Sequence, residues 1–188
     1  TTRMSAYTSK GKPLLTPDDF KGVKIRGLNP IVDAGLSAMG AAPSAMSGSK
    51  VYQALSTGVI DAGLTDIAAT WSRKYYEVQD QVVASPLFSV FFHGYVNPGW
   101  YDGLSDANKA ALAAAGTKAA AWAVAETEKA AGAAPYNLAT KNVTVHIHTA
   151  KQVAVMKAAM GPAFDKAFAA ETGEDGKKLL ELVNKIGQ

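Results

Sequence analysis

Cysteine is absent from the 188-residue sequence, and its absence removes two classes of chemistry. No disulfide can form, and no thiol can act as a nucleophile or a metal ligand. The absence does not assign a cellular compartment, because many exported proteins also lack cysteine.

Strong charge and long apolar runs are also missing. The net charge is only +3 and no basic stripe is interleaved with aromatic residues, so we expect no nucleic-acid partner. No apolar run reaches the roughly 20 residues of a membrane-spanning helix, so we expect no membrane insertion. No basic-then-apolar leader follows Thr1, which predicts a mature form or a fragment. The composition, 48% hydrophobic and 19% charged, is typical of a globular protein of one domain or two small lobes.

Short elements alternate over the first 76 residues. Ser49 is a candidate N-cap, and Gly40 and Gly58 are candidate helix ends. The pattern predicts a strand at 23–26, a helix at 31–39, an extended stretch at 42–46, a helix at 49–58, a strand at 59–64 and a helix at about 66–76. Strands and helices at these intervals predict an α/β fold with a parallel sheet.

The second half of the chain reads differently. Residues 78–97 are rich in β-forming residues and predict one or two long strands, interrupted at Pro86. An alanine-rich helix is predicted at 105–134, with an apolar stripe that includes Leu112 and Trp122.

Strict alternation then predicts a strand at 142–148, with Val143, Val145 and Ile147 facing the core. Two helices are expected at about 150–171 and 174–186, and Gly161-Pro162 should kink or break the first.

Few residues suggest catalysis or metal binding. His146 and His148 share one face of the predicted strand, but no third zinc ligand is recognisable, so we interpret them as solvent-facing. His93 stands alone between Phe92 and Gly94. The sequence contains no nucleophile elbow and no phosphate-binding glycine loop. We therefore expect no enzyme activity, no metal and no cofactor.

Arg26 is the residue that most suggests a binding site. It stands at the carboxyl end of the strand at 23–26, where open α/β sheets place their ligands. A planar guanidinium there could bind a carboxylate through two hydrogen bonds. The alternative is a surface ion pair with Asp19 or Asp33, which would contribute little.

Four segments, in this order, resemble one known family. They are "PLLTPDDFKGVKIRGLNP", "MGAAPSAMSGSKVYQALSTGVIDAGLTD", "YYEVQ" and "GYVNPGWYDGLSDANKAAL". The sequence resembles the substrate-binding proteins of tripartite ATP-independent periplasmic (TRAP) transporters over about residues 1–188, most strongly over 13–79.

The resemblance implies an α/β fold of the periplasmic-binding-protein type, a type II-like two-lobe clamp with an incomplete first lobe, because family members carry a further N-terminal segment. It implies that 1–81 and 142–188 form mainly the second lobe. Residues 82–141 would supply crossing strands and a long helix to the first lobe and the hinge.

The resemblance also implies the site residues. The family's signature arginine falls on Arg26, and Arg3 is the candidate for a second arginine. Thr65 and Asp66 stand where the family often has a polar ligand contact. Phe88 and Phe91 are candidate pocket residues, with core packing as the alternative.

The implied function is a periplasmic solute-binding protein that captures an organic acid through its carboxylate and delivers it to TRAP membrane subunits. Two alternatives stay open. One is an enzyme on the same scaffold, with His93 or Asp66 as the base beside Arg26. The other is a non-catalytic interaction module whose partner surface is the alanine-rich helix.

Overall fold

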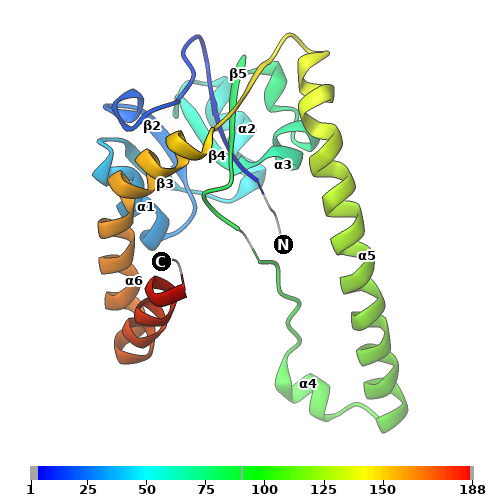
Figure 1. Ribbon diagram of the computed structural model, residues 1–188. Coiled ribbons are helices and arrows are strands. Elements are labelled where there is room, and N and C mark those ends of the chain that lie inside the picture. The colour runs from blue at the N-terminus through cyan, green and yellow to red at the C-terminus, as the bar shows by residue number, and fades with distance from the viewer. Residues whose placement is uncertain (1–3, 90, 187–188) are drawn as a thin grey trace.

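The computed structural model describes residues 4–89 and 91–186. Its centre is a six-stranded sheet in the order β3-β2-β4-β1-β5-β6, with helices packed against it (Figure 1). The strands are β1 (Ser5–Ser9), β2 (Lys24–Gly27), β3 (Ala42–Ala45), β4 (Ala62–Asp66), β5 (Gln81–Ser85) and β6 (Thr144–Ile147).

The sheet is mixed, whereas the sequence predicted a parallel one. Strand β2 pairs in parallel with β3 and β4, and β5 pairs in parallel with β6. Strand β1 runs antiparallel between β4 and β5 and is buried along its whole length. Its polar residues find partners there, since the Ser5 hydroxyl donates to the Ser85 carbonyl at 2.6 Å.

Helices cover both faces of this sheet. They are α1 (Pro30–Ala38), α2 (Gly48–Ser56), α3 (Ile67–Ser72), α4 (Pro98–Asp102), α5 (Asp106–Ala139) and α6 (Ala150–Ile186), with 3-10 turns η1 (Pro17–Phe20) and η2 (Tyr75–Glu77). Helix α1 packs on α6, and α3 packs on α5. Alternate residues of β1 enter separate cores, Tyr7 on the side of α1 and α6 and Ala6 on the side of α3 and α5.

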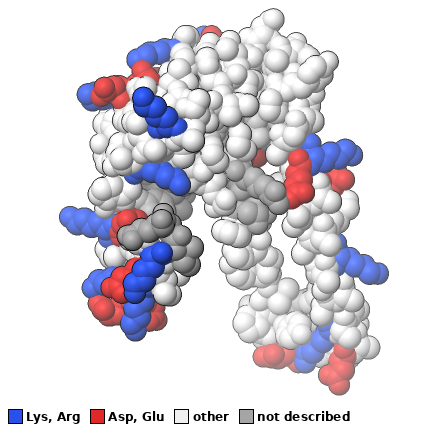
Figure 2. All heavy atoms as spheres, in the orientation of Figure 1, with Lys and Arg blue, Asp and Glu red and all other residues white. Residues whose placement is uncertain are grey.

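The predicted strand at 78–97 is wrong beyond Ser85. Strand β5 ends there, and residues 86–89 and 91–97 contain neither helix nor strand. Without a neighbouring strand to pair with, the β-forming residues of this segment have no hydrogen-bonding ladder to join. Residues 91–97 are exposed, and residues 86–97 carry no Asp, Glu, Lys or Arg. Figure 2 shows charged side chains elsewhere, including over α6 and around α4.

Helix α5 projects away from the sheet and carries α4 beside its far end (Figure 1). Its buried residues are Ala134 and Leu138, in the last turns. Trp122, in the predicted apolar stripe, is 68% exposed. The helix was predicted correctly, and most of its apolar stripe faces solvent within the described part of the chain. The assignment of 82–141 to a first lobe and hinge stays a prediction.

A kink or a break was predicted at Gly161-Pro162, and no break is found because helix α6 continues past Pro162. The predicted boundary between helices at about 150–171 and 174–186 is confirmed by the non-helical Gly173, with φ 65° and ψ −146°. A positive φ of this kind is accessible to glycine at little cost, so the chain changes direction there.

The predicted orientation of the histidines is also wrong. His148 is 5% exposed, whereas Ile147 is 62% exposed. His148 Nδ1 lies 3.0 Å from the Ser85 hydroxyl, and His146 Nε2 lies 3.1 Å from Gln81 Oε1. Val143 and Val145 pack in the core as predicted, so the departure from the predicted facing is confined to the end of the strand, at Ile147 and His148.

Burial of His148 predicts a pH dependence of stability. Burial lowers the pKa of His148 below its ordinary value of 6.5. The unfolded chain then binds this proton more readily than the folded chain does, so the free energy of unfolding should fall as the pH falls through 6.5. Urea unfolding at pH 7.5 and 5.5 measures the change, and His148→Gln should reduce it. An equal change in the variant would exclude His148 as its source.

Candidate functional site

Arg26 is held at the edge of the sheet by main-chain carbonyls. Its Nη1 donates to the Leu64 carbonyl at 2.7 Å, and its Nε donates to the Met46 carbonyl at 3.2 Å. The first acceptor belongs to β4, and the second follows β3, so both strands that flank β2 fix the guanidinium. Arg26 is 8% exposed. This geometry excludes the alternative interpretation of Arg26, a surface ion pair with Asp19 or Asp33.

The described residues place no close counter-ion beside the charge of Arg26. Among residues 4–89 and 91–186, no carboxylate forms an ion pair with it. Burial lowers the pKa of its guanidinium below the ordinary value. The group still keeps its proton at neutral pH, because arginine is protonated far above that range. A buried cation of this kind gains most from an anion that approaches it.

Asp33 lies near Arg26 but is occupied by the main chain. Its Oδ1 accepts from the Leu28 N–H at 2.9 Å, and its carboxylate lies so close to Gly27 that a Cβ there would overlap it. Burial raises the pKa of Asp33 above its ordinary value. Gly27 therefore permits the close packing of α1 against the end of β2.

Thr65 and Asp66 end the neighbouring strand β4. Thr65 is 8% exposed, and its hydroxyl oxygen lies 3.4 Å from Nη1 of Arg73. Asp66 is the N-cap of α3, and its Oδ1 accepts from the Ala69 N–H at 2.8 Å. Because β2 and β4 are parallel, their carboxyl ends bring Arg26, Thr65 and Asp66 to one edge. The Asp66 carboxylate thus caps α3, and its contact with a ligand stays a prediction.

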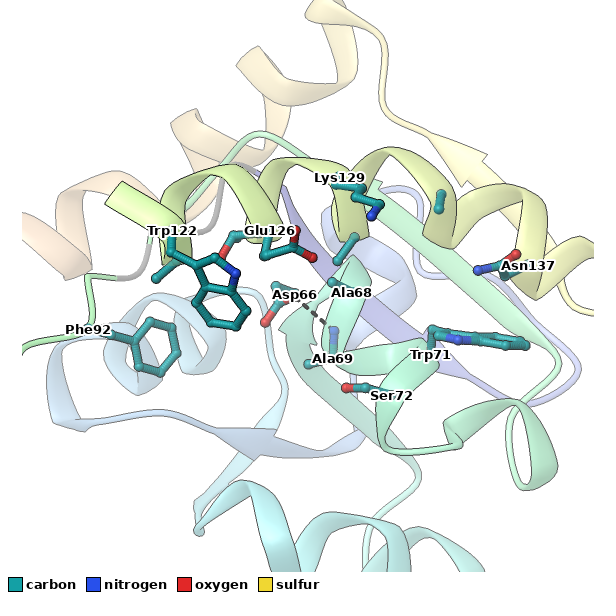
Figure 3. Close-up of a pocket in the computed structure, with 14 residues that line it drawn as sticks. Asp66, Ala68, Ala69, Trp71, Ser72, Phe92, Trp122, Glu126, Lys129 and Asn137 are labelled. Atoms are coloured by element: carbon teal, nitrogen blue, oxygen red, sulfur yellow. Dashed lines mark hydrogen bonds between the residues drawn. The ribbon is translucent and has the colours of Figure 1, made fainter. Parts of the chain in front are cut away.

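A pocket of about 620 Å³ opens beside Asp66, between α3 and α5. Its lining is mainly apolar, and Figure 3 shows Phe92 and Trp122 facing each other across one end of it. Trp71 lies at the other end (Figure 3). The pocket thus extends from the polar edge of the sheet along the projecting helix.

Phe88 and Phe91 do not join this cluster. Phe88 packs against the core on the α6 side, with its ring centroid 6.4 Å from that of Phe164. Phe91 is 64% exposed, and its ring centroid lies 6.5 Å from that of His93. Arg3 lies outside the described residues. Ligand contacts of all three stay predictions.

Arg73 and Tyr75 belong to the cluster but were not predicted from the sequence. Arg73 is the C-cap of α3, and its guanidinium folds back over Gly48, where a Cβ would overlap it. Tyr75 is fully buried, and its hydroxyl donates to the Gly48 carbonyl at 3.5 Å. Nothing in the sequence indicated that the space above Gly48 is filled by the side chain of Arg73.

Comparisons with a family model and with curated proteins both match bacterial solute-binding proteins. Residues 2–171 match the family described as bacterial extracellular solute-binding protein, family 7. The chain is 39% identical over 108 residues to the C4-dicarboxylate-binding periplasmic protein DctP of Rhodobacter capsulatus. It is 29% identical over 182 residues to the ectoine-binding periplasmic protein TeaA of Halomonas elongata.

Solved structures agree with the fold. A TRAP periplasmic solute-binding protein from Desulfovibrio salexigens, with bound orotic acid, superposes with a TM-score of 0.82 at 25% identity. The ectoine-binding protein of Halomonas elongata superposes with a TM-score of 0.80 at 24% identity.

Coverage is unequal in these comparisons. The aligned part is 54% of this chain and 29% of DctP, and 90% of this chain and 50% of TeaA. The structural match covers 98% of this chain and 59% of the orotate-bound protein. The family match nevertheless extends over most of the chain, which therefore belongs to family 7 of the bacterial extracellular solute-binding proteins, the binding proteins of TRAP transporters.

Proposed function

We propose that this chain forms one wall of a periplasmic solute-binding clamp. In this proposal Arg26 pairs with the carboxylate of an organic acid, and the protein delivers the acid to the membrane subunits of a TRAP transporter. Within the described residues, no helix is both long enough and apolar enough to span a membrane.

The observation that carries the proposal is the way in which hydrogen bonds fix the Arg26 side chain. Two carbonyls hold its guanidinium at the carboxyl ends of parallel strands, while no carboxylate among residues 4–89 and 91–186 pairs with it. A guanidinium fixed in this way is ready to bind a carboxylate with little loss of side-chain entropy. The crevice at the carboxyl ends of strands is also the general ligand position of α/β sheets.

The ligands of the relatives support an organic acid. DctP of Rhodobacter capsulatus is named for C4-dicarboxylates, and solved relatives hold orotic acid and malonate. Each of these compounds carries at least one carboxylate, the group that a guanidinium binds best.

The other wall would come from sequence beyond these 188 residues. The chain covers 59% of the orotate-bound relative. The projecting part of α5 and the exposed segment 91–97 would then pack against that wall. Closure of both walls would desolvate the carboxylate and the guanidinium and so strengthen their attraction.

Arg26→Lys should weaken binding of the acid at least about tenfold in the natural full-length protein. Lysine keeps the charge but loses the planar fork and both bonds to the Met46 and Leu64 carbonyls. A thermal-shift screen of small carboxylates first identifies a ligand, and calorimetry then measures its affinity for both proteins.

Lys24→Gln is the matched control, because Lys24 lies on the same strand but is exposed and pairs with Asp61. It should bind like the wild type. Equal binding by Arg26→Lys would contradict the proposal. Turnover of an acid would favour the enzyme on the same scaffold, and no response to any carboxylate would favour the interaction module.

A further inference from the structure

A second guanidinium lies beside that of Arg26. Arg73 follows α3, yet its side chain turns back toward the sheet, so that Nη1 lies 3.4 Å from the Thr65 hydroxyl. Its guanidinium also lies against Gly48, the first residue of α2. A side chain at position 48 would displace it.

The contacts of the two arginines interleave along the same two segments. Arg26 reaches Leu64 and Met46, and Arg73 reaches Thr65 and Gly48. Burial lowers the pKa of Arg26, and the positive charge of Arg73 lowers it further, while Tyr75, Asp33 and Asp66 act in the opposite direction. Two like charges held together in this way repel each other.

Solvent at the exposed Arg73 and the carboxylates of Asp33 and Asp66 offset part of this repulsion, but no ion pair among the described residues does. Neither guanidinium forms an ion pair with a carboxylate of residues 4–89 or 91–186. The carboxylates of Asp33 and Asp66 accept from main-chain N–H groups instead. Helix α2 adds the positive end of its dipole, since it begins at Gly48 and the Ser47 side chain makes no capping bond.

We propose that Arg73 is a specificity-determining residue that makes the Arg26 site select dianionic organic acids over monoanionic ones. The inference rests on the proposed function, since it assumes that Arg26 binds the first carboxylate. The second acidic group would meet Arg73 and relieve the repulsion between the guanidinium groups. A monoanion leaves one of the two cations without a counter-charge.

A purely structural role of Arg73 makes a different prediction. As a brace between the end of α3 and the start of α2, it would support every ligand equally. The discriminating quantity is therefore the ratio of two affinities, for a dicarboxylic acid and for its own monoamide. The two compounds have nearly the same size and differ by one charge.

The test is calorimetry on the natural full-length protein with malonate, succinate and malate, each beside its monoamide. The wild type should prefer at least one diacid to its monoamide by about tenfold or more, and Arg73→Gln should reduce this ratio about tenfold. Arg73→Lys should retain part of the preference, since the charge stays. Gly48→Ala should also lower the ratio, because its methyl group displaces the Arg73 guanidinium.

Lys74→Gln is the matched control, because it removes the same charge from an exposed neighbour. Its ratio should equal that of the wild type. Equal losses for diacid and monoamide in Arg73→Gln, or a wild type that prefers the monoamides, would overturn the inference.

The two proposals fail in different ways. If Arg26→Lys weakens both compounds while Arg73→Gln leaves their ratio unchanged, only the role of Arg73 is wrong. If Arg26→Lys changes neither affinity, or the wild type binds none of the acids, the proposed function is wrong and this inference falls with it.

Discussion

Phe20→Ala is expected to lower the free energy of unfolding by about 3–5 kcal/mol. Phe20 is fully buried at the end of η1, and its ring stands edge-on to that of Tyr7, with 5.0 Å between centroids and 84° between planes. Truncation removes this aromatic pair and leaves a cavity beneath the sheet. The loss is a large fraction of the roughly 5–15 kcal/mol that stabilises a typical domain.

Urea unfolding of the 188-residue chain, followed by circular dichroism, measures this loss. Phe92→Ala is the matched control, since Phe92 is 75% exposed and its truncation should change the free energy by no more than about 0.5 kcal/mol. Equal losses in the two variants would show that residues 91–97 pack against the core in solution, contrary to the structure.

The 188-residue chain made alone is expected to self-associate or to bind a hydrophobic dye. Large apolar side chains are exposed along the projecting part of the molecule: Phe91, Phe92, Tyr95, Val96, Trp100, Trp122 and Val124. The first four of them lie on a segment, 86–97, that carries no Asp, Glu, Lys or Arg. Contiguous apolar surface of this kind is unusual in a monomer.

Sedimentation velocity with a titration of 1-anilinonaphthalene-8-sulfonate (ANS) tests this expectation. The natural full-length protein is the control, and it should bind less dye because the proposed second wall covers the same side chains. A compact monomer of the 188-residue chain that binds no ANS would contradict the proposal of a missing wall.

Much of the fold could be predicted where the hydrophobic pattern is local. The segments 23–26, 31–39 and 42–46 became β2, α1 and β3 within one or two residues. Strand β1 gave no such signal, because its sequence "SAYTS" is mostly small and polar, although every residue in it is buried. Its strand character comes from pairing on both edges, which a local pattern does not contain.

The site could be predicted only in part. Arg26 was proposed from its place at the end of a predicted strand and from the family resemblance, and Thr65 from the resemblance alone; the structure brings both to the carboxyl ends of neighbouring strands. Arg73 could not be predicted, since a long side chain after a helix can extend in any direction. Its direction depends on the space above Gly48, which exists only once α2 and α3 are packed.

The central position of β1 also bears on the order in which the chain folds. Ser5 pairs with Asp66 on one side and with Ser85 on the other, so β1 can pair only after residues far along the chain have been synthesised. Helix α1 packs on α6, which ends the described chain. Such distant contacts make folding slow, because the chain loses the entropy of closing long loops before these contacts can stabilise it. The chain should therefore leave the ribosome largely unfolded, in a state that chaperones can bind.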